Sequence, residues 1–264
     1  PRYGAVIGVL QTVLQMLEEA GLPPGVINLV FGDGPEVGRV ALTHRDLAGV
    51  HFTGSTETFQ EIWRTIGANI AGYRNYPRIV GETGGKDFIV AHRSADPDAL
   101  ATSIVRGAFE FQGQKCSAPS RTYVPESQWA GLRERLHAEV PQLRVGDPTD
   151  PSVFVGAVID ADAFAKHQKA IDEARAAADI VVGGDLDSST GWFVNPTVVR
   201  TEDPGFRLLS DELFGPIMTA FVYPDDRWDE LLRQVDTQSP YALTGAVFAN
   251  VVSVLASATG SPPV

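Results

Sequence analysis

FEFQGQKCSAPSR, residues 109–121, is the stretch around which the chain is organised, because it contains the only cysteine among 264 residues. An apolar-periodic helix runs into Gly113, and polar residues then surround the sulfur, so the pattern places Cys116 on a turn. A lone thiol forms no internal disulfide. As a nucleophile it must be a thiolate, which at neutral pH requires a nearby cation or oriented N–H groups. Lys115 and the backbone of the turn are candidates to supply them. An inert cysteine is the alternative interpretation of the same residues.

Composition and charge restrict the class of protein. Apolar residues make up 44% of the chain and charged residues 20%, as is ordinary for a soluble globular protein with one or two domains. The net charge of −12 argues against binding to a nucleic-acid backbone. No run approaches the roughly eighteen uninterrupted apolar residues of a membrane span, so we expect no membrane partner. A single cysteine fits a reducing compartment.

Strand-like and helix-like segments alternate along the chain, which predicts an α/β fold with a largely parallel sheet. The helices are expected at 5–20, after the glycine-rich loop 32–38, after 53–56, and at 97–109, 129–140 and 161–177. The strands are expected at 26–31, 49–52, 121–124, 180–182, 193–199 and 217–222, with a strand, a turn and a second strand in 77–90. Taken alone, 77–90 indicates a hairpin.

Three short motifs carry further chemistry. Residues 53–56 (TGST) offer a glycine and hydroxyls at a helix N-terminus, which suits an anion, although the same residues also suit a simple N-cap without a ligand. Residues 82–86 (ETGGK) leave a glutamate at a strand end before two glycines, which allow close backbone approach. Residues 212–216 (ELFGP) on their own fit a helix end broken by Gly-Pro.

Together these motifs resemble the aldehyde dehydrogenase superfamily, in which a Glu-x-Gly-Gly-Lys motif precedes a Gly-Gln-x-Cys nucleophile. The motifs at 52–55 and 212–216 follow the family's order. Four longer segments resemble the branch that oxidises L-glutamate γ-semialdehyde, the open form of 1-pyrroline-5-carboxylate. They are 51–59 (HFTGSTETF), 92–96 (HRSAD), 113–117 (GQKCS) and 241–248 (YALTGAVF). The resemblance covers about residues 10 to 250.

The resemblance implies an aldehyde dehydrogenase-like α/β fold with two domains. Residues 1–83 would form a partial, Rossmann-like NAD-binding domain, and residues 84–264 an α/β catalytic domain that is incomplete at its C-terminal end. The family's upstream asparagine, which completes the oxyanion hole, would precede Pro1, and the segment that anchors the substrate carboxylate is not found after Asn250. We therefore expect the chain to be a fragment or a truncated product.

The resemblance also assigns roles to residues of the catalytic centre. It implies that Cys116 is the nucleophile and that Glu82, which we expect to be partly buried, is the general base that activates the hydrolytic water. Ser117 would help to bind the far carboxylate of glutamate semialdehyde, and Phe111 would line its aliphatic part.

The cofactor implied by the resemblance is NAD. Ser55 would lie under the pyrophosphate, with Thr53 and Gly54 shaping the loop. Glu212 would bind the hydroxyls of the nicotinamide ribose, and Phe214 would pack near the nicotinamide ring.

The function that follows is NAD-dependent oxidation of L-glutamate γ-semialdehyde to L-glutamate through a cysteine thioester, a step of proline degradation. The alternatives are an inactive remnant and a cofactor-independent cysteine esterase or acyltransferase. The five histidines are widely spaced, so no metal site is predicted. The expected partner is a small aldehyde; the resemblance implies homo-oligomers for full-length family members, and the assembly of this fragment is left open. The expected compartment is the cytoplasm, or the mitochondrial matrix in a eukaryote.

Overall fold

A computed structural model describes residues 2–259 of the chain. Pro1 and residues 260–264, the outer ends of the two expected domains, lie outside this range. The chain divides between Thr83 and Gly84 into two compact units, which are described separately here. Which function belongs to which unit stays a prediction.

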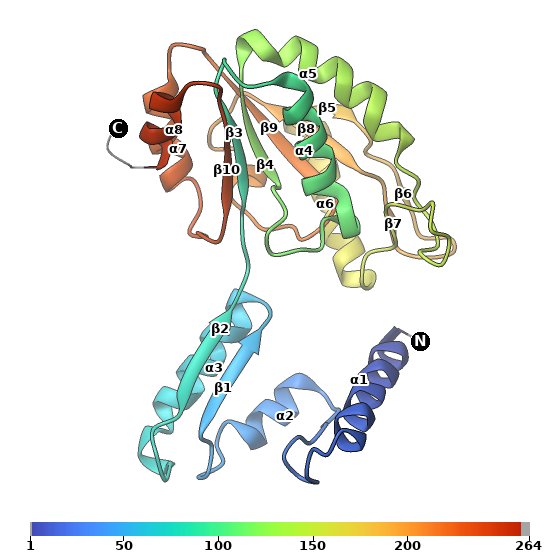
Figure 1. Cartoon of the computed structure of the whole chain (residues 1–264), viewed down its shortest axis with the longest axis vertical. Helices are drawn as coiled ribbons and strands as arrows, with labels where there is room; N and C mark the ends of the chain where they lie inside the picture. Colours follow the sequence, from blue (N-terminus) through green and yellow to red (C-terminus); the bar gives the residue numbers. More distant parts are fainter. Residues whose placement is uncertain (1, 260–264) are drawn as a thin grey trace. The chain divides into compact units, whose positions relative to one another are not determined.

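Residues 2–83, the described part of the first unit, form three α-helices and a two-stranded parallel sheet (Figure 1). Its elements are α1 (Arg2–Glu19), α2 (Gly34–Ala41), β1 (Gly49–Thr53), α3 (Thr56–Ala68), a 3-10 turn (Ile70–Gly72) and β2 (Arg78–Glu82). Side-chain caps fix where two helices begin: the carboxylate of Asp33 accepts the Glu36 N–H, and the hydroxyl of Ser55 accepts the Thr58 N–H. The three helices expected here are confirmed.

The strand expected at residues 26–31 does not form. The segment has no regular secondary structure, and Val26 and Val30 are 62% and 70% exposed. A strand exists only where a neighbour completes its hydrogen bonds, and among the described residues β1 pairs with β2 alone in this sheet. The apolar, β-branched composition of 26–31 therefore misled the prediction.

The second unit contains a six-stranded sheet in the order β10-β3-β4-β9-β8-β5. All neighbours run parallel except the edge strand β5, which confirms the expected largely parallel sheet. The strands are β3 (Phe88–Ala91), β4 (Arg121–Pro125), β5 (Asp179–Val182), β8 (Thr197–Thr201), β9 (Ile217–Tyr223) and β10 (Gly245–Phe248), with a small antiparallel pair of β6 (Leu186–Asp187) and β7 (Phe193–Val194). The helices are α4 (Pro97–Phe109), α5 (Glu126–Glu139), α6 (Ala161–Ala177), α7 (Trp228–Thr237) and α8 (Val252–Thr259), with 3-10 turns at Glu110–Gly113, Val140–Gln142 and Arg207–Leu209.

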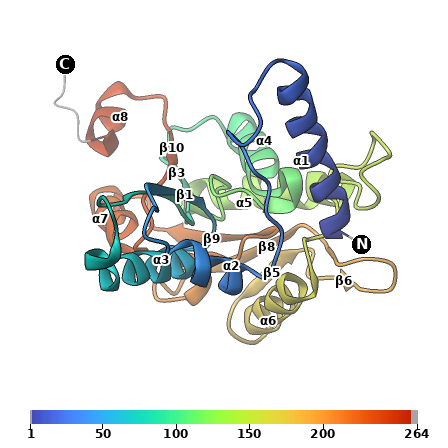
Figure 2. The same ribbon diagram turned by 90° about the horizontal axis from the view of Figure 1, so that it is seen from below.

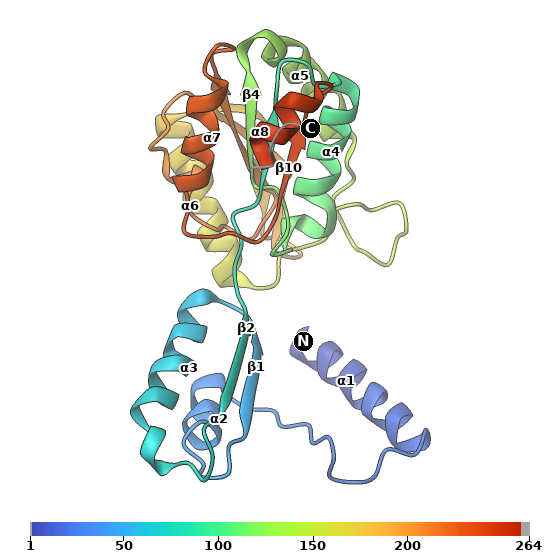
Figure 3. The same ribbon diagram turned by 60° about the vertical axis from the view of Figure 1, so that its left-hand side comes forward.

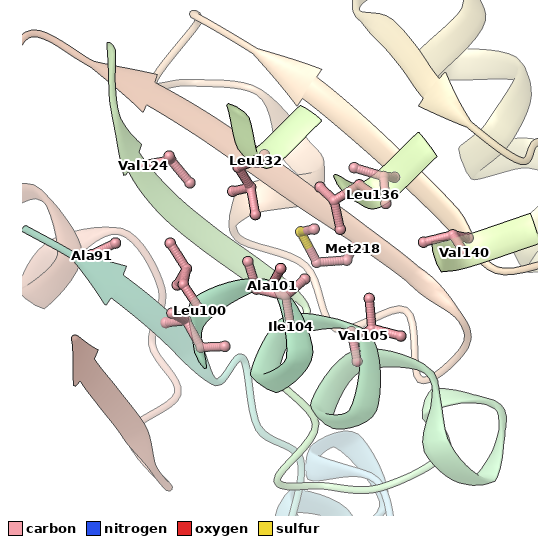
Figure 4. Packing of buried hydrophobic residues seen from close by; sticks show 14 of the residues in the cluster. Ala91, Leu100, Ala101, Ile104, Val105, Val124, Leu132, Leu136, Val140 and Met218 are labelled. Atoms are coloured by element: carbon pink, nitrogen blue, oxygen red, sulfur yellow. The ribbon is translucent and has the colours of Figure 1, made fainter. Parts of the chain in front are cut away.

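Helices cover both faces of this sheet, with α4 and α5 on one face and α6 and α7 on the other (Figures 2 and 3). Helix α4 shows why the sequence folds this way. The Asp96 carboxylate accepts the N–H groups of Asp98 and Ala99 at 2.8 and 3.0 Å, and Pro97 occupies the first turn, where its missing N–H costs nothing. The expected apolar stripe of α4 is buried, and Figure 4 shows Leu100 and Ile104 in a cluster with Met218 of β9.

Two expected strand arrangements are wrong. Residues 77–90 are not a hairpin: β2 pairs with β1, whereas β3 pairs with β4 and β10 in the other unit. The single strand expected at 193–199 is two strands, β7 and β8, interrupted at Asn195 and Pro196. Proline has no N–H to donate, so it ends a ladder in the middle of a run of strand-forming residues.

In the described part of the chain, none of the helices combines the length and apolar character that crossing a membrane would require.

Candidate active site

Three loops meet at one edge of the six-stranded sheet. Residues 83–87 lead into β3, residues 114–120 into β4, and residues 210–216 into β9. Because these strands are adjacent and parallel, the three loops lie at their shared amino-terminal edge. Ligands of open α/β sheets usually bind at the opposite, carboxyl-terminal edge, so this arrangement is unusual for the fold class.

Cys116 lies on the middle loop and is exposed, as the sequence predicts. The loop follows a 3-10 turn in which Phe111 and Gln112 have left-handed backbones, with φ of 54° and 46°. Phe111 itself is 63% exposed. Within residues 2–259 the amide N–H of Cys116 donates to no acceptor, so it is available to bind an oxygen atom of a substrate.

Lys115 does not supply a free positive charge beside Cys116. Its ammonium group binds the carboxylate of Glu110. This hydrogen bond holds the pKa of Glu110 below its ordinary value. Since the charge of Lys115 is already compensated, the backbone of the turn is the better candidate for stabilising negative charge at Cys116.

Gly85 joins the nucleophile to Glu212. A Cβ atom on Gly85 would lie 2.2 Å from the carbonyl oxygen of Cys116, so no residue with a side chain allows this approach. The N–H of Gly85 donates to Oε1 of Glu212 at 2.8 Å. The structure thus brings together Cys116 and Glu212, two predicted site residues that are 96 positions apart in sequence. Gly85 contacts both, by close packing against Cys116 and by a hydrogen bond to Glu212.

The third loop presents Glu212 and Phe214. Glu212 is half-buried, and Phe214 is 38% exposed with a left-handed backbone, φ 57°. A residue with a side chain in this conformation is strained, and such strain persists only where the surrounding structure enforces it.

Sequence reasoning missed a buried polar layer beneath these loops. Lys86, Asp87 and Arg121 are each 2% exposed or less. The Arg121 guanidinium donates from Nε to the carbonyl of Lys86 at 2.8 Å, and Asp87 accepts the backbone N–H of Thr244 at 2.6 Å. Burial raises the pKa of Asp87, and burial together with the nearby Arg121 lowers the pKa of Lys86 to about 7. Their burial could have been inferred from their position in the sequence, because Lys86 and Asp87 directly precede a strand that is covered on both faces.

In the first unit, the predicted phosphate loop and Glu82 lie next to each other. Thr53 and Glu82 are register partners at the ends of β1 and β2, and the N–H of Gly54 donates to the Glu82 carbonyl at 3.1 Å. Ser55 is exposed at the start of α3. Glu82 is exposed rather than partly buried as expected.

Comparison with known proteins identifies the family. The aldehyde dehydrogenase family model matches residues 6–260, slightly more than the range expected from the motifs. The chain belongs to the aldehyde dehydrogenase family. Metal-binding clusters of His, Cys, Asp or Glu are absent from the described residues of this aldehyde dehydrogenase chain.

Several relatives have names from one branch of the aldehyde dehydrogenases. The chain is 47% identical over 241 residues to the mitochondrial delta-1-pyrroline-5-carboxylate dehydrogenase of Dictyostelium discoideum, covering 90% of this chain and 43% of the relative. The crystal structure of the delta-pyrroline-5-carboxylate dehydrogenase from Mycobacterium tuberculosis bound with NAD is 52% identical, with a TM-score of 0.87 over 94% of this chain and 45% of that one. The Thermus 1-pyrroline-5-carboxylate dehydrogenase with bound NAD is 34% identical, with a TM-score of 0.86 over 92% and 46%. The chain therefore spans less than half the length of these relatives.

Each unit of this aldehyde dehydrogenase chain contains residues that fit a part of a dinucleotide. Helix α3 is 13 residues long, and its N-terminus, with Ser55 exposed, suits a phosphate. In the second unit, one oxygen of the Glu212 carboxylate is engaged by Gly85, while the other accepts no hydrogen bond from a described residue and so is free for a hydroxyl group.

Proposed function

We propose that this chain contributes to the NAD-dependent oxidation of L-glutamate γ-semialdehyde to L-glutamate. In this proposal residues 1–83 belong to the NAD-binding domain and residues 84–264 to the catalytic domain. The single observation that carries it is the bridge through Gly85, which holds the exposed nucleophile Cys116 and the predicted ribose-binding Glu212 at one sheet edge. The names of the relatives support the choice of substrate and cofactor.

The first half of the reaction belongs to Cys116. Its thiolate attacks the aldehyde carbon and forms a hemithioacetal, while the carbonyl oxygen takes up the negative charge. The N–H of Cys116, which donates to no acceptor among the described residues, stabilises that charge. NAD, held by Ser55, Glu212 and Phe214, would supply the hydride acceptor that oxidation of the hemithioacetal to a thioester requires.

The second half requires water. In this proposal Glu82 removes a proton from the water that attacks the thioester carbon, and Cys116 leaves as the thiolate. Three peptide bonds join Glu82 to Gly85, the glycine that packs against the Cys116 carbonyl. The roles of Ser55, Glu212 and Phe214 are to bind and orient the cofactor.

Replacing Glu82 with glutamine is expected to slow deacylation about a hundredfold, because an amide cannot accept the proton of the attacking water. Acylation should be affected much less, so that one equivalent of NADH still appears as a rapid burst. Stopped-flow absorbance at the NADH band measures both phases. The matched control is Glu61→Gln, an exposed glutamate of α3. A Glu82→Gln variant with the wild-type steady-state rate contradicts the role given to Glu82.

Replacing Ser117 with alanine is expected to raise the Michaelis constant for glutamate semialdehyde about tenfold, since a hydrogen bond to the substrate's far carboxylate is lost. The constant for a simple aldehyde without that carboxylate should change less than twofold. Steady-state assays with both substrates, and with Ser120→Ala as a control in the same turn, test this. Equal changes for both aldehydes show that Ser117 does not recognise the carboxylate.

One experiment tests the whole proposal: add NAD and 1-pyrroline-5-carboxylate, follow NADH, and assay Cys116→Ala in parallel. NADH formation that depends on Cys116 supports it. Ester hydrolysis that depends on Cys116 but not on NAD indicates a cysteine hydrolase instead. Binding of NAD without turnover indicates an inactive remnant.

The compartment and the assembly belong to the same proposal. We expect the cytoplasm, or the mitochondrial matrix in a eukaryote; the name of the Dictyostelium relative includes the word mitochondrial. Association into homo-oligomers stays a prediction from the family.

A further inference from the structure

His167 lies beneath the loop that presents Glu212 and Phe214, and the mechanism above does not use it. It is on α6, far from the site in sequence, and its side chain is 0% exposed. Its Nε2 atom lies 3.0 Å from the carbonyl oxygen of Leu213, between the two presented residues. Buried histidines commonly make such a hydrogen bond, so the bond alone does not indicate a function.

The contact extends to the other side of the turn. A Cβ atom built on Gly215 would lie 2.0 Å from Nε2 of His167, so the imidazole fills the space that a side chain at position 215 would need. Between these contacts, Phe214 has its left-handed backbone, φ 57°. Both neighbours of the strained residue are therefore held by the same imidazole ring.

The chemistry of the bond fixes the protonation state of the ring. A carbonyl oxygen only accepts hydrogen bonds, so Nε2 must carry the proton that it donates. Burial is the main cause that lowers the pKa of His167 to about 4; the nearby Lys166 acts in the same direction, whereas hydrogen bonding to the backbone of Leu213 and Phe214 opposes the shift. The imidazole is therefore neutral near pH 7, with Nδ1 unprotonated; in the described part of the structure Nδ1 has no hydrogen-bond partner.

We propose that His167 is a positioning residue: its Nε2–H bond to Leu213, with the packing against Gly215, holds Phe214 in the left-handed conformation and thereby orients Phe214 and Glu212 toward the dinucleotide. The effect on the cofactor rests on the proposed function, whereas the effect on the turn does not. His167 touches neither substrate nor cofactor in this role.

Two substitutions separate the hydrogen bond from the volume of the ring. His167→Leu introduces an apolar side chain of similar size and leaves the buried Leu213 carbonyl without a donor. His167→Gln offers an amide nitrogen at about the place of Nε2 and can restore the bond. His137→Leu is the matched control, because His137 is an exposed histidine of α5, which covers the opposite face of the sheet.

Amide hydrogen exchange across residues 212–217 and the dissociation constant for NAD are measured for the full chain. In His167→Leu the exchange of these amides should be about tenfold faster and NAD binding about tenfold weaker, with His167→Gln within about threefold of wild type and His137→Leu unchanged. Wild-type exchange in His167→Leu overturns the proposal, as does a His167→Gln variant no better than His167→Leu.

Nitrogen-15 NMR of the wild-type imidazole tests the hydrogen bond from His167 to Leu213 even if His167→Leu does not fold. The Nε2–H tautomer, persisting from pH 5 to 8, is expected, and the Nδ1–H tautomer or a charged ring contradicts the proposed bond. If the wild-type chain binds no NAD, the proposed function fails, while exchange and tautomer still test the positioning of the turn.

Discussion

Replacing Cys116 with serine is expected to lower NAD-dependent aldehyde oxidation by at least about 10⁴-fold, the order of loss seen when a covalent nucleophile is removed. The substitution changes one atom on an exposed turn, so the backbone contacts of that turn should survive. A hydroxyl group is far less ionised than a thiol at neutral pH. Nothing described at Cys116 would activate it, because the nearest cation considered, Lys115, is paired with Glu110.

The measurement is single-turnover formation of NADH with enzyme in excess, which detects acylation even if later steps are slow. NAD affinity serves as the control and should stay within about twofold of wild type, because Cys116 does not hold the cofactor in the proposed mechanism. A Cys116→Ser variant that retains more than about 1% of the wild-type acylation rate would show that the oxidation does not proceed through the sulfur.

Much of this site could be predicted from the sequence because the capping residues, the apolar pattern and the family motifs all indicate the same structure there. Asp96, Pro97 and the apolar stripe of α4 each specify the same helix, and the 3-10 turn that follows it ends at Gly113, just before Cys116. Recognition of the family's motifs then gave roles to residues that no local pattern distinguishes. Glu212, for example, fits an ordinary helix end until it is seen to accept the N–H of Gly85.

The predictions that failed depend on partners that are distant in sequence. Residues 26–31 have strand-forming composition but no neighbouring strand among the described residues, and β2 and β3 are close in sequence yet join different sheets. Burial of polar groups is equally non-local. His167 and Lys86 read as ordinary surface residues, and only the packing of loops over them shows that they are enclosed.

The second large effect concerns Lys86 and stability. Lys86 is 1% exposed, and Nζ finds no hydrogen-bond partner within residues 2–259. Its pKa falls from 10.5 in the unfolded chain to about 7, first because of burial and then because of Arg121. The unfolded chain thus binds more protons than the folded one between these values, so stability rises as pH increases from 7 to 10.5 and is lowest below 7.

Replacing Lys86 with methionine is therefore expected to stabilise the second unit at pH 7. Three and a half pKa units at 1.36 kcal/mol each set an upper bound of about 5 kcal/mol, and half-protonation at pH 7 reduces this to about 4 kcal/mol. Methionine is unbranched, of similar length and uncharged, so it can fill the same space. Wild type should gain about 2 kcal/mol from this group between pH 7 and 9, and the variant should lack that gain.

Urea unfolding at pH 7 and 9 measures both effects, with Lys169→Met, an exposed lysine of α6, as the control for loss of a positive charge. If Lys86→Met is instead less stable than wild type at pH 7, with an unchanged pH dependence, the ammonium group is charged and compensated in the folded protein. Stabilisation at pH 7 that shrinks by pH 9 shows the reverse: the fold retains an amine that it must bury or deprotonate, directly beneath the loops that carry Cys116 and Glu212.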